Sequence, residues 1–329
     1  MQPLDIQVVE QAMHWCKAGE GFWLCTVLST FGSSPRAPGS WLIAKADGDH
    51  CGSLSGGCVE EEFLARLKDG EFRGRLNRVR YGAADGPDNP RVSLPCGGVL
   101  DVLVEHWPAN EHTFEHFQSL KKALAGAGAL VRNLCLKTGE VELIPDDSLG
   151  SKVEEDQNEQ RVRLRVGPVS RLVIAGLSPV STVCASFAHS LGFEVIVCDP
   201  RPEEVRHFNV PGVTLRQELP SVWIAREGCH RATAVVALTH DPKIDDTALI
   251  EAVKTDAFYI GVMGSQRTSE KRRERLLRIG GLTEAQTDRI HMPIGLNIGS
   301  KTPAEIALSV MADVVRVREG VTAPALHLA

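Results

Sequence analysis

The chain lacks the features that mark several large classes of protein. Its formal net charge is −6 and aromatic residues make up only 5% of it. A nucleic-acid-binding surface is usually basic and often uses aromatic rings to stack bases. The longest apolar stretches, such as residues 234–238, fall far short of the roughly 18 residues that a membrane span needs. We therefore expect no nucleic acid and no membrane among the partners.

The sequence also contains no CxxC pair, which gives a structural zinc site little support. Its nine cysteines are odd in number and irregularly spaced, a pattern typical of free thiols in a reducing compartment. The N-terminus, MQPLD, has neither the basic segment nor the apolar segment of a secretory signal. These absences together predict a cytoplasmic protein.

A length of 329 residues suggests two domains. Residues 1–145 predict a mixed α+β domain, and the polar, acidic stretch 146–165 has the composition of a linker. In 166–329, short apolar strands alternate with helical segments, which is typical of a Rossmann-like, doubly wound parallel sheet. The overall fold class is therefore α/β.

The predicted Rossmann-like domain has an incomplete nucleotide fingerprint. The turn after its first strand, GLSPVS at 176–181, keeps only the first of the three glycines, and Pro179 removes one N–H from the anion-binding end of the helix. Asp199 stands where a ribose-binding carboxylate is expected, but a carboxylate that caps a turn is an equal interpretation. NAD(P) binding is accordingly disfavoured.

Two other turns in this domain are candidates for chemistry. The turn formed by Gly264, Ser265 and Arg267 opens a helix and has the N–H groups and the charge to hold a phosphate, or it is an ordinary strand-to-helix turn. His240 follows a strand at the expected ligand edge, where it is either a candidate acid, base or ligand or half of a structural His–Asp pair.

Two loops in the first domain combine a thiol with paired glycines, SGGC at 55–58 and PCGG at 95–98. Paired glycines let a backbone approach a ligand closely, and a cysteine at a helix N-terminus favours the thiolate that binds soft partners. The alternative is that both cysteines are small buried turn residues. The candidate binding residues are Cys58, Cys96, Gly56, Gly57, Gly97 and Gly98.

Arg36, between two prolines, either faces an anionic ligand or is a solvated loop arginine. The run 60–62 of three glutamates suits the positive end of a helix.

These segments, in this order, resemble the XdhC/CoxI family of xanthine dehydrogenase accessory proteins. The resemblance is carried by GSSPRAPGSWLIAKADG, GSLSGGCVEEEFLARL, CGGVLDVLVE, ALTHDPKID, YIGVMGSQRTSEKR and IHMPIGLNIGSKTPAEIALSVMADVV. It covers nearly the whole chain apart from 111–165. One departure is the 176–181 turn, where Pro179 replaces the histidine of the GAGHVG-like turn that is common in the family.

The resemblance implies a chaperone rather than an enzyme. It implies that the protein binds molybdenum cofactor as cargo, in its molybdopterin form or a dinucleotide form, and delivers it after sulfuration to a molybdenum hydroxylase of the xanthine dehydrogenase type. It also implies a cysteine desulfurase as a partner, with Cys58 and Cys96 as the best candidates for contacting cofactor or sulfur. We expect a homodimer, since a two-domain chaperone could enclose its ligand at a dimer interface. Two alternatives remain open at this point: an NAD(P)-dependent oxidoreductase, and a scaffold that holds desulfurase and hydroxylase together.

Overall fold

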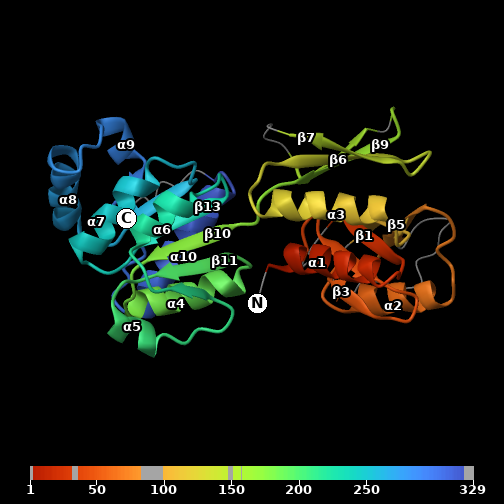
Figure 1. Cartoon of the computed structure of the whole chain (residues 1–329), viewed down its shortest axis with the longest axis horizontal. Helices are drawn as coiled ribbons and strands as arrows, with labels where there is room; N and C mark the ends of the chain where they lie inside the picture. The colour runs from red at the N-terminus through yellow and green to blue at the C-terminus, as the bar shows by residue number, and fades with distance from the viewer. Residues whose placement is uncertain (1–2, 32–35, 83–98, 147–150, 157, 322–329) are drawn as a thin grey trace. The chain divides into compact units, whose positions relative to one another are not determined.

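The computed structural model describes residues 3–31, 36–82, 99–146, 151–156 and 158–321. The chain divides into two compact units, Leu4–Pro168 and a second that comprises Val169–Ala329 together with the first three residues (Figure 1). Each unit has its own sheets and its own apolar cores.

The first unit is built on a five-stranded antiparallel sheet with the order β3-β2-β1-β5-β4. Its strands are β1 (Phe22–Phe31), β2 (Trp41–Ala44), β3 (His50–Gly52), β4 (Leu76–Tyr81) and β5 (Val99–Trp107). Helix α2 (Cys58–Lys68) packs Val59 and Phe63 on the face that carries Cys25 and Val27. Since successive strand residues face opposite sides, Phe22 lies on the other face, where it contacts Trp15 of α1 (Leu4–Lys17) and Phe117 of α3 (Glu111–Leu124).

A second sheet in this unit corrects the predicted linker. The four strands β6 (Leu130–Cys135), β7 (Val141–Pro145), β8 (Val153–Asp156) and β9 (Arg161–Val166) form an antiparallel sheet in the order β7-β6-β9-β8. All of β8 and most of β9 lie within 146–165. Val162 and Leu164 of β9 are buried against Leu28 and Leu103 of the first sheet, whereas the residue between them faces outward. The polar composition that suggested a linker therefore belongs to the solvent side of a half-buried sheet.

The second unit confirms the predicted doubly wound fold. Its parallel sheet has the order β12-β11-β10-β13-β14-β15, with α4 (Pro179–Ser190) and α10 (Pro303–Arg318) on one face and α6 (Pro220–Glu227), α7 (Pro242–Ala252) and α8 (Gln266–Arg278) on the other. The short helices α5 (Pro202–His207) and α9 (Glu284–Asp288) complete it. The strands are β10 (Arg171–Ala175), β11 (Glu194–Cys198), β12 (Thr214–Arg216), β13 (Thr233–Ala237), β14 (Tyr259–Val262) and β15 (Ile290–His291).

This strand order determines where the ligand edge lies. All five strand pairs are parallel, so the carboxyl ends of the strands, and the loops that follow them, share one edge. The chain order reverses between β10 and β13, and a crevice at such a reversal is the usual ligand position in open α/β sheets. The turns at Gly176, Thr239 and Gly264 all follow strands at this edge.

A glycine at the end of β3 supplies a stability prediction. Gly52 has φ +105°, and a Cβ there would overlap the carbonyl oxygen of Trp41 on the paired strand, whereas Gly48 has φ +96° and open space around it. Both Gly→Ala changes strain the backbone, but only Gly52→Ala also overpacks the sheet, so it should cost roughly 1–3 kcal/mol more than Gly48→Ala. Urea unfolding followed by tryptophan fluorescence measures this, because four of the five tryptophans lie in the first unit. Equal losses would contradict the overlap.

Candidate functional site

Three loops named by the sequence leave the five-stranded sheet at the same end. The strand pairing aligns Phe31, at the end of β1, with Val99, at the start of β5, and Tyr81, at the end of β4, with Leu100. The start of β2 and the end of β3 lie at this end too, since Leu42 pairs with Gly52. Segments 32–40, 53–57 and 82–98 all begin or end here. The sheet thus brings together the Arg36 loop, the SGGC loop and the strand ends that flank the CGG loop.

The SGGC loop wraps around a carboxylate that sequence reasoning did not single out. The side chain of Glu60, in the first turn of α2, accepts six hydrogen bonds. Its Oε1 accepts from the backbone N–H groups of Leu54, Ser55 and Gly56 at 2.8–3.0 Å and from Ser53 Oγ at 2.8 Å. Its Oε2 accepts from Ser55 Oγ at 2.7 Å and Gly57 N–H at 2.9 Å.

These hydrogen bonds control the charge of Glu60. The residue is only 7% exposed, and burial alone would raise its pKa. The hydrogen bonds from Ser55, Gly56 and Leu54 outweigh burial and hold the pKa of the Glu60 carboxyl far below its usual value. Glu60 is therefore an ionised carboxylate that serves as an internal anion for the loop.

This arrangement revises what the two glycines do. Gly56 (φ +90°) and Gly57 (φ +151°) adopt backbone conformations that favour glycine, and both are exposed. Their N–H groups point to Glu60, so these donors are already used within the protein. The signal that would have found Glu60 was its place three residues after Gly57, the spacing of a capping box. Cys58 follows Gly57 directly and is the first residue of α2.

The remaining candidates at this end differ in how much the structure describes. Cys96, Gly97 and Gly98 lie outside the described residues. Arg36 is half-buried and has an interaction partner, so it is not a freely solvated arginine. Burial raises the pKa of Asp5 in α1, and the positive charges of Lys152 and Arg36 partly offset that effect.

A second carboxylate fixes the strands from which two of these loops depart. Asp101, 5% exposed, accepts hydrogen bonds from Arg80 Nε at 2.8 Å, Arg80 Nη2 at 2.9 Å and Ser29 Oγ at 3.1 Å. Burial opposes its ionisation, but these bonds outweigh burial and lower the pKa of the Asp101 carboxyl. Asp101 thus joins β1, β4 and β5 near the strand ends that lead into the Arg36 and CGG loops.

In the second unit, the candidate phosphate turn is exposed. Ser265 is the N-cap of α8, and its hydroxyl accepts the backbone N–H of Thr268 at 3.2 Å. Arg267 is exposed, and its side chain makes no hydrogen bond or ion pair within the described part of the chain. The turn therefore offers an open helix N-terminus with an uncommitted guanidinium, which suits an anion.

In the turn of the nucleotide fingerprint, at 176–181, the protein's own groups occupy Asp199. Asp199 is fully buried and accepts from Leu177 N–H at 2.6 Å and from Arg201 Nη2 at 2.6 Å. A Cβ on Gly176 (φ +82°) would overlap the methyl group of Thr239, so the loops after β10 and β13 touch each other. Asp199 thus caps this turn and ties down Arg201, and the geometry gives no support to a ribose-binding role.

A buried ionic network positions the loops that follow β13 and β14 at the ligand edge of the sheet. Arg272 of α8, 2% exposed, donates to the carbonyl oxygen of Met263 at 3.0 Å and to Asp245 Oδ2 at 3.3 Å. Asp245 in turn accepts from the Thr239 hydroxyl at 2.7 Å and the Thr239 N–H at 3.2 Å. One pair of buried charges therefore holds both the loop that bears His240 and the Gly264 turn. The His240 loop is half-buried or exposed along its length, and the histidine has φ +67°.

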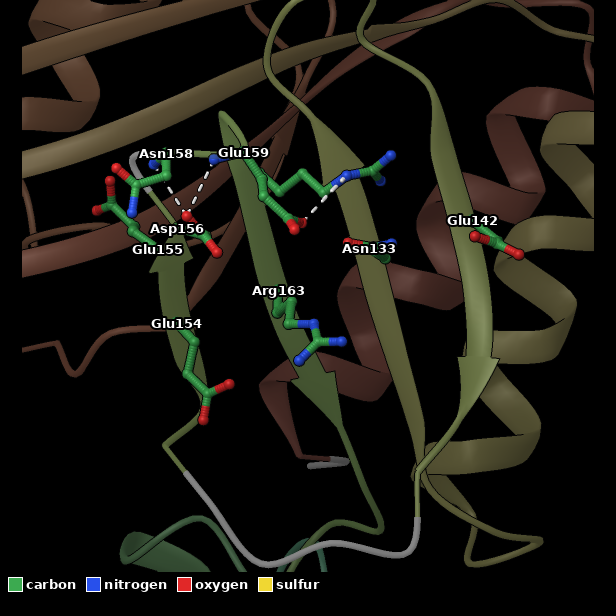
Figure 2. A pocket seen from close by; sticks show the side chains of 9 residues that line it. Asn133, Glu142, Glu154, Glu155, Asp156, Asn158, Glu159 and Arg163 are labelled. Carbon is green, nitrogen blue, oxygen red and sulfur yellow. Dashed lines mark hydrogen bonds and ion pairs between the residues drawn. The ribbon is translucent and has the colours of Figure 1, made fainter.

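The outer face of the four-stranded sheet is hollowed (Figure 2). The hollow, about 840 Å³, is lined by Asn133, Glu142, Glu154, Glu155, Asp156, Asn158, Glu159, Arg161 and Arg163. Carboxylates outnumber guanidinium groups in this set, so the hollow disfavours an anionic ligand. Among the described residues, no cluster of three or more His, Cys, Asp or Glu is arranged to hold a metal ion, and no helix is long and apolar enough to cross a membrane.

Comparison with known proteins identifies the family. Residues 172–314 match the model of the XdhC Rossmann domain, and residues 15–82 match the model of the XdhC and CoxI family. The two matches lie in the two units described above. The chain belongs to the XdhC and CoxI family, as its motifs indicated.

Two curated relatives and one solved structure resemble nearly the whole chain. The molybdenum cofactor insertion chaperone PaoD of Escherichia coli (strain K12) is 26% identical over 317 residues, which cover 94% of this chain and 88% of PaoD. A Bacillus subtilis (strain 168) protein named as a probable xanthine dehydrogenase subunit is 25% identical, over 91% of this chain and 93% of the relative. A crystal structure named as a xanthine dehydrogenase from Bacillus halodurans has a TM-score of 0.70 at 23% identity, over 99% of this chain and 98% of that one. This last likeness supports the fold.

The contacts that occupy Asp199 predict that NAD and NADP do not raise the thermal stability of the protein. A ligand present at about 100 times its Kd would add roughly 2.7 kcal/mol to the free energy of unfolding. We expect no thermal shift with NAD or NADP, because Asp199 is committed to Leu177 and Arg201. Differential scanning fluorimetry with each nucleotide checks this, and a clear upward shift would revive the oxidoreductase alternative.

The buried ion pair predicts a large difference between two adjacent arginines. Arg272→Leu leaves Asp245 buried without its counter-charge and should destabilise the second unit by about 3–5 kcal/mol. Arg273 pairs with Glu284 and Asp288 at the surface, so Arg273→Leu should cost no more than about 1 kcal/mol. Urea unfolding at pH 8 measures both.

The deficit of Arg272→Leu should also depend on pH. Burial already raises the pKa of Asp245, and removing Arg272 takes away a charge that lowers it. A carboxyl whose folded pKa lies above its unfolded value takes up a proton more readily in the folded state, so its destabilising effect falls as the pH is lowered. The deficit should therefore be smaller at pH 5 than at pH 8, and a deficit that does not change with pH would contradict an unpaired Asp245.

Proposed function

We propose that this protein binds molybdenum cofactor, protects it, and delivers it after sulfuration to a molybdenum hydroxylase of the xanthine dehydrogenase type. The observation that carries the proposal is that the Arg36 loop, the SGGC loop and the strand ends that flank the CGG segment lie at one end of the five-stranded sheet. The likeness to PaoD over nearly the whole chain supports the same role. In this proposal the protein is a chaperone, the cofactor is its cargo, and its place of action is the cytoplasm.

Within this proposal, Cys58 and Cys96 contact the cofactor or its sulfur, and Gly97 and Gly98 shape the site. Gly56 and Gly57 act through the turn that they form, because their N–H groups are bound to Glu60. Arg36 supplies positive charge at the same end. In the second unit, Gly264, Ser265 and Arg267 are proposed to contact a phosphate, since their turn has an open helix N-terminus and an uncommitted arginine.

The partners follow from the proposed reaction. A cysteine desulfurase supplies the sulfur that a hydroxylase cofactor needs, and the hydroxylase receives the cargo. The Bacillus subtilis relative is named for xanthine dehydrogenase, which supports a client of that type. We propose a homodimer, which would let the protein enclose an oxygen-labile cargo.

The proposal predicts cargo on the purified protein. Anaerobic purification from cells that make the cofactor should give near-stoichiometric molybdenum and, after oxidation, pterin fluorescence. Cys58→Ala and Cys96→Ala should each lower the occupancy, because a thiolate is a ligand suited to the soft centre of the cofactor. Cys135→Ala is the matched control, since Cys135 lies on β6 in the other sheet of the same unit.

Two results would contradict this proposal in different ways. Equal pterin in the wild type and all three variants would remove Cys58 and Cys96 from the site. No pterin in the wild type, together with co-purification of desulfurase and hydroxylase, would favour the scaffold alternative.

A further inference from the structure

The Glu60 carboxylate lies within the SGGC loop of the proposed site, and it was not among the expected ligands. It is 7% exposed, and all six of its hydrogen bonds come from the five residues 53–57, which immediately precede Cys58. From this geometry we infer that Glu60 is a positioning residue for cofactor binding. It holds the SGGC loop in one conformation and so fixes where the chain enters α2 at Cys58. This inference rests on the proposed function.

The loop needs an anion at this position. Four consecutive backbone N–H groups, from Leu54 to Gly57, converge on the two oxygens of one carboxylate. Such a concave set of donors attracts an anion, and without one the N–H dipoles repel each other and lose their hydrogen bonds. Gly56 and Gly57, with their positive φ values, have conformational freedom to open the loop if the anion is removed.

Glu60 also connects the exposed loop to a rigid part of the protein. Its neighbour Val59 and the next apolar residue of α2, Phe63, are fully buried against the sheet. Ser55 strengthens the connection, because its hydroxyl donates to Glu60 and accepts the N–H of Val59 at 3.2 Å. The position of the loop is therefore set by the packing of α2, which is what a binding loop on a scaffold requires.

The test compares Glu60→Gln with Glu61→Gln. The first substitution would keep the size of the side chain, but the new side chain would carry no charge and would present an NH₂ group to a ring of donors. Glu61 is the adjacent residue and is exposed, and its side chain makes no hydrogen bond or ion pair within the described part of the chain, so it is a matched control. Glu60→Asp is a second variant that retains the charge on a shorter side chain.

Two measurements are made on the full-length protein. Hydrogen exchange of the amides of residues 54–57 reports on the loop without any cofactor, and anaerobic titration with molybdenum cofactor released from a purified molybdoenzyme gives the Kd. We expect Glu60→Gln to exchange these amides at least about tenfold faster and to bind cofactor about 10–100-fold more weakly, by analogy with groups that orient metal ligands. Glu60→Asp should fall between it and the wild type, and Glu61→Gln should match the wild type.

A purely structural role would give a different pattern. In that case Glu60→Gln would lower the thermal midpoint, but the Kd measured well below that midpoint would equal the wild-type value. Unchanged affinity despite faster exchange would overturn the inference, as would unchanged exchange. Failure of the wild type to bind cofactor is a separate result, seen before any variant is made; it would overturn the proposed function and this inference with it.

Discussion

The carboxylate of Glu60 is the interaction on which the candidate site depends most. A loop with two adjacent glycines has little conformational preference of its own, and its N–H groups point inward. By supplying one buried negative charge, Glu60 satisfies four of these donors and two hydroxyls at once. The Glu60 carboxyl stays ionised because the hydrogen bonds that it accepts compensate for its removal from water. The loop geometry and the ionisation of Glu60 therefore depend on each other.

The second unit uses the same physical device at its ligand edge. Asp199 binds the turn after β10, and Asp245 binds the turn after β13, each with an arginine as counter-ion. In both cases a carboxylate at the ligand edge is used to hold a loop. The two turns differ in what is left for a ligand. The carboxylate at the 176–181 turn is already bound by the protein, whereas the turn at Ser265 and Arg267 is exposed and open to an anion. The Rossmann fold is thus retained, although Asp199, at the position of the usual ribose-binding carboxylate, is bound by Leu177 and Arg201.

Several elements could be predicted from sequence because their signals are local. The alternation of apolar strands and helices identified the doubly wound sheet. The capping box formed by Thr302 and Glu305 at the start of α10 is a signal of the same local kind. The linker prediction was wrong because composition was averaged over 146–165, which hid the buried Val162 and Leu164 on either side of the exposed Arg163. The role of Glu60 was missed because three adjacent glutamates look equivalent in sequence, yet only one of them faces the loop.

The sequence alone determined the family, the fold class of each unit and the loops worth inspecting, since these depend on motifs and on periodicity along the chain. Only the tertiary structure decided which of those loops meet, because the meeting depends on strand order and register between segments far apart in sequence. It also decided which hydrogen-bond donors and acceptors are free. The N–H groups of Gly56 and Gly57 and the carboxylate of Asp199 are already paired with partners in the folded chain. A hydrogen bond is satisfied or left open only by atoms within about 3 Å, and folding alone brings those atoms together.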